Sequence, residues 1–312
     1  MAYYIAVDAG GTKTETLLFD ETGHILLRDM DKGCNAMAMG VDTTAERAIS
    51  VLKRVSAHIP GGKPDFAYCG ISSVIYYKEL RERLNAAFPD WPVSWQDGGI
   101  SLISSMIDGQ QGGCMVCGTG TSLFVRNGDA LYHIGGLGYL IDTMGSGYWL
   151  GREALLASYK MIEGRGPKTV LLDMVERQMG KPITDSIPDI YDGGRAFIAS
   201  FARNIFAGRK MGDAVCRDIF ERGSKELSDL TWAAAEHVNG EFDVVMSGGI
   251  FLNFPEYAQA VIAKSSPLMR PVRATVPPVF GSAKEAVWRH GGVVDAAFKA
   301  KMQAEYDAIL GK

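Results

Sequence analysis

YYIAVDAGGTKTETLLFDETGHILLRD, residues 3–29, contains three short runs of strand-forming residues, and glycine-bearing turns separate them. Glycine turns between such runs are typical of β-hairpins, so this stretch predicts three consecutive paired strands. The expected strands are 3–10, 15–20 and 24–29, and the first turn is 10–13.

A similar pattern returns from residue 114 onward. Three strand-forming runs follow one another again, the first two joined by a Gly-Thr-Gly turn at 118–120 and the last two by Asn127-Gly128. Such internal repetition indicates that the chain consists of two related halves. The expected strands of the second set are 114–117, 122–126 and 130–134.

Helices and strands alternate after each hairpin set. In the first half we expect a helix at about 43–58, opened by a capping box of Thr43 and Glu46, then a strand at 65–72, a helix at 77–88, a strand at 92–97 and a helix at 99–107. In the second half we expect a helical insert at about 152–240 with a Gly/Pro-rich loop at 180–194, then a strand at 243–249, a helix at 254–264, a strand at 272–277 and a helix at 283–291.

Each half therefore has the order βββαβαβα. This order predicts an α/β fold in which each half forms a mixed sheet with helices on both faces. We expect two domains, 1–112 and 113–312, that face each other across a cleft, with the first hairpin turn of each half directed into it.

Composition narrows the classes of function. The formal net charge is −4, and without a basic excess or a Lys/Arg block we expect neither a nucleic-acid-binding nor a membrane-bound face. The N-terminus reads as a strand rather than a signal peptide, and five cysteines are an odd number, so we expect a reducing, cytoplasmic compartment. Cys114 and Cys117 lie in an apolar run, which favours buried packing over a metal or redox site.

The first turn carries chemistry suited to phosphate. Gly10 and Gly11 let the backbone turn tightly and direct N–H groups at an anion, and Thr12 and Lys13 add donors. Asp8 stands where a carboxylate could hold hydrated Mg²⁺ beside a polyphosphate. A plain hairpin turn is the alternative interpretation.

The second turn favours phosphate binding over that alternative, because Gly118, Thr119 and Gly120 repeat the pattern at the same place in the second half. Neither turn is a P-loop or a dinucleotide fingerprint, since each leads into a strand rather than a helix. Gly248 and Gly249, between an expected strand and a helix, would let a flat nucleoside lie against the backbone.

Asp97 has two interpretations. It ends an expected strand, where a carboxylate faces the crevice of an open α/β sheet and could accept a proton from an attacking hydroxyl. It also precedes an expected helix, and Asp is a favoured N-cap. The sequence leaves both roles open.

Together these motifs resemble the BadF/BadG/BcrA/BcrD ATPase family, and within it the N-acetylglucosamine kinase branch, over nearly the whole chain. The resemblance implies two ribonuclease H-like domains of the actin-like ATPase fold, shared with hexokinase and the 70-kDa heat-shock proteins. It implies ATP and Mg²⁺ as cofactors and a small-molecule sugar as substrate, phosphorylated at the primary hydroxyl of an amino sugar or N-acetylamino sugar. Members of the family are often homodimers.

The resemblance also implies roles for individual residues. Asp97 in QDGG is similar to the family's catalytic Asp, and Asn35 in GCNAMA to a sugar-binding Asn. The nucleotide would be bound by Asp8, Gly10, Gly11, Thr12, Lys13, Gly118, Thr119, Gly120, Ala199, Gly248, Gly249 and Asn253. The sugar would be bound by Asn35, Asp97, Thr121, Ser122, Gly135, Gly136, Leu137, Asp142 and Thr143.

The sugar-binding stretch departs from the family pattern GGWGHxxGDEGS. Leu137 stands in place of the Trp, and Thr143-Met144 in place of the Asp-Glu pair. The carboxylate that contacts sugar hydroxyls is therefore absent unless Asp142, one position earlier, replaces it. Because a site built to hydrogen-bond particular hydroxyls discriminates through those groups, we expect altered sugar selectivity.

Two other classes of function are compatible with the family. One is an ATPase that activates a dehydratase or reductase, but such activators carry a cluster-binding cysteine in the pattern CxxGTG, where this chain has Met115. The other is a sugar- or nucleotide-binding protein without catalytic activity, which the altered sugar stretch would allow.

Overall fold

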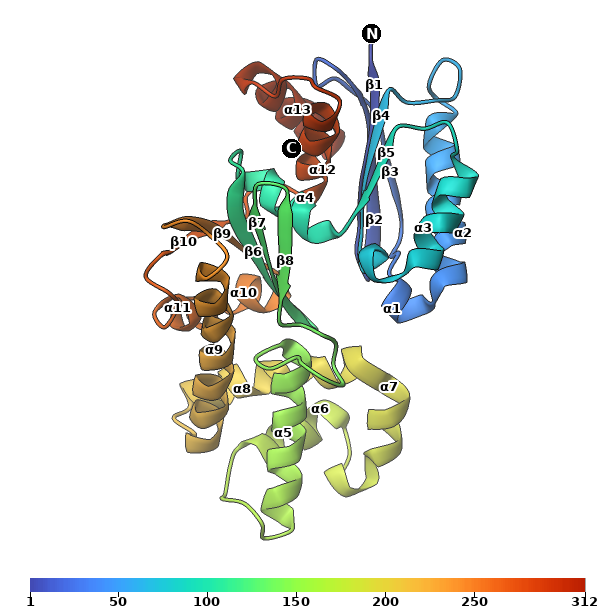
Figure 1. The fold of residues 1–312 in the computed structure, drawn as a ribbon. Helices are drawn as coiled ribbons and strands as arrows, with labels where there is room; N and C mark the ends of the chain where they lie inside the picture. Colours follow the sequence, from blue (N-terminus) through green and yellow to red (C-terminus); the bar gives the residue numbers. More distant parts are fainter. Residues whose placement is uncertain (312) are drawn as a thin grey trace. The chain divides into compact units, whose positions relative to one another are not determined.

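The computed structural model describes residues 1–311 and contains two five-stranded mixed sheets. Each sheet belongs to its own compact unit (Figure 1). Unit 1 comprises Met1–Asp108 and the segment from Ala274 onward, and unit 2 is Gly109–Arg273. The expected α/β class with two repeated sheets is confirmed.

The sheet of unit 1 has the strand order β3-β2-β1-β4-β5. Its first three strands are antiparallel, and β4 and β5 continue the sheet in parallel with β1. This arrangement places β1 at the centre. The strands are β1 (Tyr3–Ala9), β2 (Lys13–Asp20), β3 (Ile25–Lys32), β4 (Phe66–Ile71) and β5 (Val93–Gln96).

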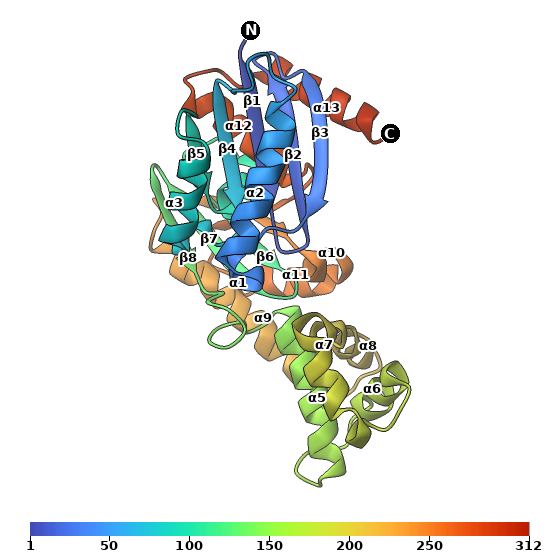
Figure 2. The ribbon, with the colours of Figure 1, turned by 90° about the vertical axis from the view of Figure 1, so that its right-hand side faces the viewer.

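Helices cover both faces of this sheet (Figure 2). The side chains of Ile5 and Val7 pack with α2 and α3 in one apolar core. Successive strand residues point to opposite faces, so Asp8 points to the other face, which α4 and α12 cover. The helices of the unit are α1 (Ala36–Met39), α2 (Val41–Ser56), η1 (Val74–Tyr76), α3 (Lys78–Ala87), α4 (Gly98–Met106), α12 (Pro278–Arg289) and α13 (Ala296–Ile309).

The sheet of unit 2 repeats this topology with the order β10-β9-β6-β7-β8, so β6 takes the central place of β1. Strands β6, β7 and β8 are antiparallel, while β9 and β10 run parallel to β6. The strands are β6 (Gln111–Cys117), β7 (Thr121–Asn127), β8 (Ala130–Ile134), β9 (Phe242–Ser247) and β10 (Met269–Arg273).

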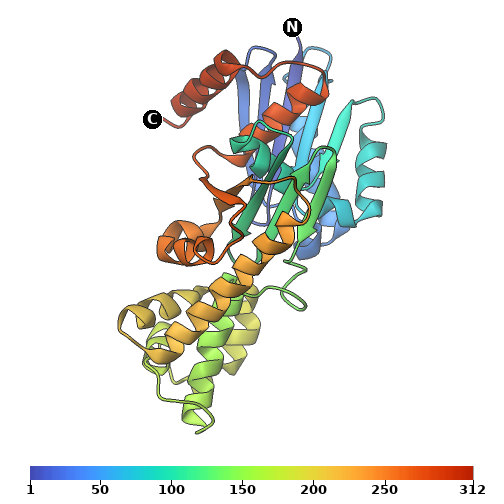
Figure 3. The same ribbon diagram turned by 60° about the vertical axis from the view of Figure 1, so that its left-hand side comes forward.

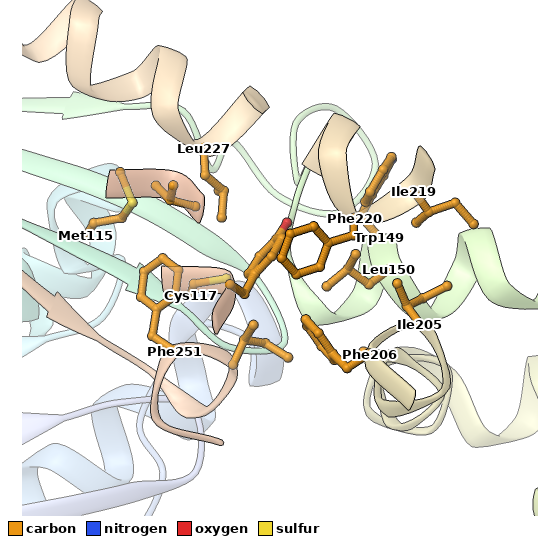
Figure 4. Packing of buried hydrophobic residues seen from close by; sticks show 14 of the residues in the cluster. Met115, Cys117, Trp149, Leu150, Ile205, Phe206, Ile219, Phe220, Leu227 and Phe251 are labelled. Atoms are coloured by element: carbon orange, nitrogen blue, oxygen red, sulfur yellow. The ribbon is translucent and has the colours of Figure 1, made fainter. Parts of the chain in front are cut away.

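A helical insert follows β8, as the sequence predicts. Figure 3 shows its last helix, α9, running from the helical group to the sheet of unit 2. Aromatic rings such as Phe206, Phe220 and Trp149 fill the core where helices and sheet meet (Figure 4). The helices are α5 (Gly147–Ile162), α6 (Leu171–Met179), η2 (Ile183–Asp185), α7 (Ile187–Ser200), α8 (Ala202–Lys210) and α9 (Ala214–Ala235), followed after β9 by α10 (Gly249–Asn253) and α11 (Pro255–Ile262).

Two local predictions were wrong. Helix α2 begins at Val41 with Gly40 as its N-cap, so Thr43 and Glu46 lie inside the helix and form no capping box. The expected loop 180–194 contains η2 and the first half of α7, with Pro188 in the first helical turn. Proline is well suited to that position because the first N–H groups of a helix have no partner within it.

The last part of the chain differs from the expected division into domains. Helix α12 was expected to complete the second half, but it packs on α4, β1 and β4 of unit 1. Ser282 donates to the carbonyl of Val7 at 2.9 Å, and a Cβ atom on Gly281 would lie 1.7 Å from the carbonyl oxygen of Ser101. This close approach explains why a glycine faces α4. The cleft expected between the two halves stays a prediction.

Candidate active site

The first glycine turn follows β1, the central strand of unit 1. The N–H of Gly10 donates to the carbonyl of Lys13 at 3.0 Å and closes the turn. The N–H of Cys34 donates to the carbonyl of Gly10 at 2.8 Å, and that of Gly33 donates to Thr12 at 3.1 Å. A Cβ atom on Gly33 would lie 2.3 Å from the carbonyl oxygen of Gly11, so a glycine is required there. The turn is thereby joined to the segment that leads to Asn35.

Asp8 lies beside this turn and is half-buried. Its Oδ1 lies 3.7 Å from the Cβ position on Gly98, at the start of α4. Burial raises the pKa of Asp8 to about 7; the Lys13 charge opposes this rise, and the charges of Glu15 and Asp97 add to it. Lys13 itself forms an ion pair with the buried Glu15 at 2.9 Å. A carboxyl group in such surroundings favours a cation beside it.

Asp97 is only 6% exposed and is the N-cap of α4, as one of its two interpretations predicted. Oδ1 accepts a hydrogen bond from the N–H of Gly99 at 3.2 Å. Oδ2 accepts one from the N–H of Ser73 at 2.9 Å. Capping does not exclude proton transfer, because a carboxylate oxygen has two lone pairs.

Ser73 is a residue of this site that the sequence did not reveal. Its φ is 64°, which makes it the single non-glycine residue in the left-handed region among residues 1–311. Its hydroxyl donates to Oδ1 of Asn35 at 2.8 Å, and its N–H donates to Asp97. Left-handed conformations at residues other than glycine are costly and are found where the surroundings enforce them, often at functional sites.

Asn35, Ser73 and Asp97 thus form one hydrogen-bonded group. Asn35 is the N-cap of α1, where its Oδ1 also accepts from the N–H of Met37 at 2.9 Å. An isolated parallel bridge between Asn35 and Ser72 brings the two segments together. The structure therefore places the expected sugar-binding Asn within two hydrogen bonds of the expected catalytic Asp.

The second glycine turn follows β6, the central strand of unit 2. The N–H of Gly118 donates to the carbonyl of Gly120 at 2.8 Å. The N–H groups of Gly147 and Tyr148 donate to the carbonyls of Gly118 and Thr119 at 2.8 and 2.9 Å. The turn is therefore fixed to the start of α5. A Cβ atom on Gly120 would meet no atom closer than 4.0 Å, so this part of the turn is open.

Two of the residues expected around the adenosine, Gly248 and Gly249, lie close to this turn. A Cβ atom on Gly118 would lie 3.9 Å from the N–H nitrogen of Gly249, where α10 begins. Gly248 has a φ of 102°, and its Cβ position is 2.4 Å from the carbonyl oxygen of Cys117, so both conformation and space require a glycine. Asn253, at the end of α10, donates to the carbonyl of Gly249 at 2.7 Å. Ala199 is half-buried on α7.

The expected sugar stretch forms a loop between β8 and α5. A Cβ atom on Gly136 would lie 2.0 Å from the carbonyl oxygen of Thr121 and 2.4 Å from Oγ of Ser122, so the loop crosses the start of β7 at van der Waals distance. Gly135 and Gly136 both have positive φ, at 66° and 69°. Leu137 is 55% exposed.

Asp142 and Thr143 form bonds inside this loop. Oδ2 of Asp142 accepts from the N–H of Gly136 at 3.0 Å. The hydroxyls of Thr143 and Ser146 lie 2.7 Å apart, and Ser146 is the N-cap of α5. These bonds hold the shape of the loop.

All five cysteines are free and buried, which confirms the interpretation of Cys114 and Cys117 as packing residues. Met115, at the place of the activators' cluster ligand, is buried in the core of unit 2. Within residues 1–311 there is no cluster of His, Cys, Asp and Glu suited to a metal ion, and none of the helices there combines the length and the hydrophobicity of a membrane span.

Two sheets of the same strand order, each with a glycine turn after its central strand, define the class as an actin-like ATPase fold. A model of the BadF/BadG/BcrA/BcrD ATPase family matches residues 5–286. The chain belongs to this family.

Proteins of known description are similar to the chain. An N-acetylmuramic acid/N-acetylglucosamine kinase of Clostridium acetobutylicum is 30% identical over 50% of this chain and 53% of its own length, so the match spans about half of that relative. A glucosamine kinase of Vibrio cholerae is 20% identical over 80% of this chain and 85% of its own. A solved structure from Chromobacterium violaceum, described as a candidate N-acetylglucosamine kinase, is 20% identical with a TM-score of 0.68, over 90% of this chain and 98% of that one.

Proposed function

We propose that this protein is an ATP-dependent sugar kinase that phosphorylates the primary hydroxyl of an amino sugar or N-acetylamino sugar. The observation that carries the proposal is the buried Asp97 carboxylate at the carboxyl edge of the first sheet, bonded through Ser73 to Asn35 and electrostatically coupled to Asp8. Membership of an ATPase family and similarity to two kinases of amino sugars support it.

The nucleotide is assigned to both glycine turns. The turns formed by Gly10, Gly11, Gly118 and Gly120, with the side chains of Thr12, Lys13 and Thr119, bind the phosphates, while Gly248, Gly249, Asn253 and Ala199 flank the adenosine. Asp8 would be the one carboxylate of this chain to hold a Mg²⁺ ion beside the phosphates, since its surroundings favour a cation. When bound, such an ion neutralises charge on the phosphate oxygens.

Asp97 is assigned as the general base. The oxygen of the sugar hydroxyl attacks the γ-phosphorus of ATP and forms the new P–O bond, and its proton passes to the Asp97 carboxylate. The bond between the γ-phosphorus and the bridging oxygen breaks, and ADP leaves with the electron pair. The products are ADP, the sugar phosphate and one proton, which Asp97 returns to water. The backbone donors from Gly99 and Ser73 fix the position of the carboxylate.

The sugar is assigned to Asn35 and Asp97 of unit 1 and to Thr121, Ser122 and the loop 135–143 of unit 2. Within that loop the site would comprise Gly135, Gly136, Leu137, Asp142 and Thr143. Asp142 and Thr143 form hydrogen bonds within the loop. They therefore act on the sugar by fixing the shape of the loop more than by direct contact. We therefore expect the sugar selectivity to be broader than that of a kinase with a Trp and a carboxylate in this stretch.

The free, buried cysteines support a cytoplasmic location, as expected from their odd number. A homodimer, expected from the family, stays a prediction.

A coupled assay of ADP release tests the function. The purified protein is given ATP and Mg²⁺ with N-acetylglucosamine, glucosamine, N-acetylmuramic acid, N-acetylmannosamine or glucose, and a reaction without sugar serves as the control. We expect sugar-dependent ADP release with at least one amino sugar, and the sugar phosphate in the product by mass spectrometry. ADP release that no sugar stimulates would contradict the proposal and favour an ATPase activator.

A further inference from the structure

Helix α7 is interrupted close to the second glycine turn. Gly194 has a φ of 59° and a ψ of −154°, which are not helical values, and it divides α7 into two parts. The next residue, Arg195, is exposed. Its Nη2 lies 4.0 Å from the Cβ position on Gly120, which makes it the nearest heavy atom to the open side of the turn.

Aromatic stacking holds the Arg195 guanidinium at this position. Its Cζ lies 4.8 Å from the centre of the Tyr139 ring, within the range of a cation–π contact. Tyr139 contacts the Tyr148 ring edge to face at 5.5 Å between centres. The N–H of Tyr148 in turn donates to the carbonyl of Thr119. Tyr148 therefore contacts both the glycine turn and the ring of Tyr139 that stacks on Arg195.

Arg195 has no carboxylate within ion-pair distance in the part of the chain that the structure describes. This distinguishes it from Arg222, which pairs with Glu153 and Asp218 on the same insert. The second turn, Gly118–Thr121, contributes no charged side chain of its own. An unpaired guanidinium beside an uncharged, anion-binding turn is suited to phosphate, because its planar fork matches two phosphate oxygens.

We propose that Arg195 binds the terminal phosphates of the nucleotide at the second turn, with Tyr139 as its positioning residue. This inference rests on the proposed function, since it assigns the same turn to phosphate. A fixed positive charge at that place would also stabilise the charge that spreads over the phosphoryl oxygens during transfer.

Nucleotide binding without sugar tests the inference separately from kinase activity. Isothermal titration calorimetry measures the affinity for the non-hydrolysable analogue AMPPNP and for AMP in the wild type, Arg195→Ala and Arg195→Lys. Arg177→Ala is the matched control, because Arg177 is an exposed arginine on α6 of the same insert. We expect Arg195→Ala to weaken AMPPNP binding about tenfold or more and AMP binding less than twofold, and Arg195→Lys to recover part of the loss.

Variants of Tyr139 test the stacking contact. Tyr139→Phe keeps the ring and should leave AMPPNP affinity within twofold, while Tyr139→Leu should weaken it about threefold or more. If Arg195→Ala bound AMPPNP as the wild type does, in a protein that makes sugar phosphate, the role of Arg195 would be overturned while the proposed function stood. Weakened binding in Arg195→Ala, in a protein that phosphorylates no sugar, would support Arg195 and overturn the kinase.

Discussion

The two glycine turns occupy equivalent places, after the central strands β1 and β6, but their surroundings differ. The first turn is surrounded by the ionisable side chains of Asp8, Lys13 and Glu15, and it bonds to the segment that leads to Asn35. The second turn contains no charged residue, and its carbonyls accept hydrogen bonds from the start of α5. The repeat in the sequence therefore reproduces the backbone but not its surroundings: under the proposed function both turns bind phosphate, and only the first lies beside a carboxylate suited to a metal ion.

The close contact between the first turn and Gly33 predicts the largest effect on stability. Gly33→Ala would place a Cβ atom 2.3 Å from the carbonyl oxygen of Gly11, and backbone atoms cannot move away as a flexible side chain can. We expect the free energy of unfolding to fall by about 3 kcal/mol, the usual scale for overpacking a close contact. Urea denaturation measures this loss. Gly61→Ala, at a surface turn with no atom within 4 Å, is the control and should cost about 1 kcal/mol. Equal losses in both variants would show that the first turn is not rigidly joined to Gly33.

At the second turn there is free space beside Gly120, so a substitution there should affect nucleotide binding more than stability. Gly120→Val adds a side chain into space that only Arg195 approaches, at 4.0 Å, so the free energy of unfolding should change by less than about 1 kcal/mol. Affinity for ATP should fall about tenfold or more, because the new side chain occupies the space assigned to phosphate. Calorimetric titration measures the affinity, and thermal unfolding serves as the check on folding. Unchanged ATP affinity in a folded variant would remove this turn from the site.

The charge around the first turn predicts a smaller effect that depends on pH. The pKa of Asp8 is raised to about 7 in the folded protein, while an unfolded Asp titrates near 3.9. The folded state therefore binds a proton that the unfolded state has lost between about pH 4 and pH 7, so this contribution to stability disappears as the pH rises through that window.

Asp8→Asn removes this titration. The difference between pKa values of about 7 and 3.9 corresponds to about 4 kcal/mol, and solvent screening at this half-buried carboxyl reduces it. In metal-free buffer we therefore expect the variant to gain about 1–2 kcal/mol relative to the wild type on going from pH 4 to pH 8. Urea denaturation at both pH values measures the difference, and Asp129→Asn, at an exposed position in unit 2, is the control. Parallel stability curves for wild type and Asp8→Asn would mean that the pKa of Asp8 is the same in the folded and unfolded protein, and would contradict the electrostatic surroundings described here.

The repeated hairpins could be predicted from the sequence because glycine turns between strand-forming runs are local signals. The domain to which α12 belongs could not, because its packing on β1 and α4 depends on contacts distant in sequence, such as that between Ser282 and Val7. The capping box at Thr43 failed because the helix begins two residues earlier, at Val41, and no local signal opposed the motif.

Site residues show the same division. The N-cap role of Asp97 could be predicted because helix caps have a recognisable pattern, and its catalytic role stays a prediction. Ser73 was missed, since its left-handed conformation follows from the bonds to Asn35 and Asp97 and nothing in the residue type indicates it. Arg195, to which we assign phosphate binding, was not predicted either, although Gly193-Gly194 before it signals an interruption of the helix.

The central claim is that Asp97 is the general base. Because Asp97 also accepts two backbone hydrogen bonds, a test by mutation must separate loss of catalysis from loss of stability. Both of its carboxylate oxygens accept backbone N–H groups, so the amide group in Asp97→Asn would replace one acceptor with a donor. This loss should lower the free energy of unfolding by about 1–3 kcal/mol even if Asp97 has no catalytic role. A control with the same defect elsewhere is therefore needed.

Asp213 provides that control. It is the N-cap of α9, where Oδ1 accepts from the N–H of Cys216 at 2.9 Å and Oδ2 from the N–H of Val170 at 2.9 Å. Asp213→Asn should therefore lose a similar free energy of unfolding while its turnover stays within about twofold of the wild type.

The direct test is kcat of Asp97→Asn and Asp213→Asn, measured at a temperature where circular dichroism shows both variants folded, with the sugar that gives the highest turnover. The account predicts that Asp97→Asn lowers kcat about a hundredfold or more, the usual scale for loss of a positioned acid–base group, while ATP affinity persists. Turnover in Asp97→Asn as high as in Asp213→Asn would contradict the account and leave Asp97 as a helix cap.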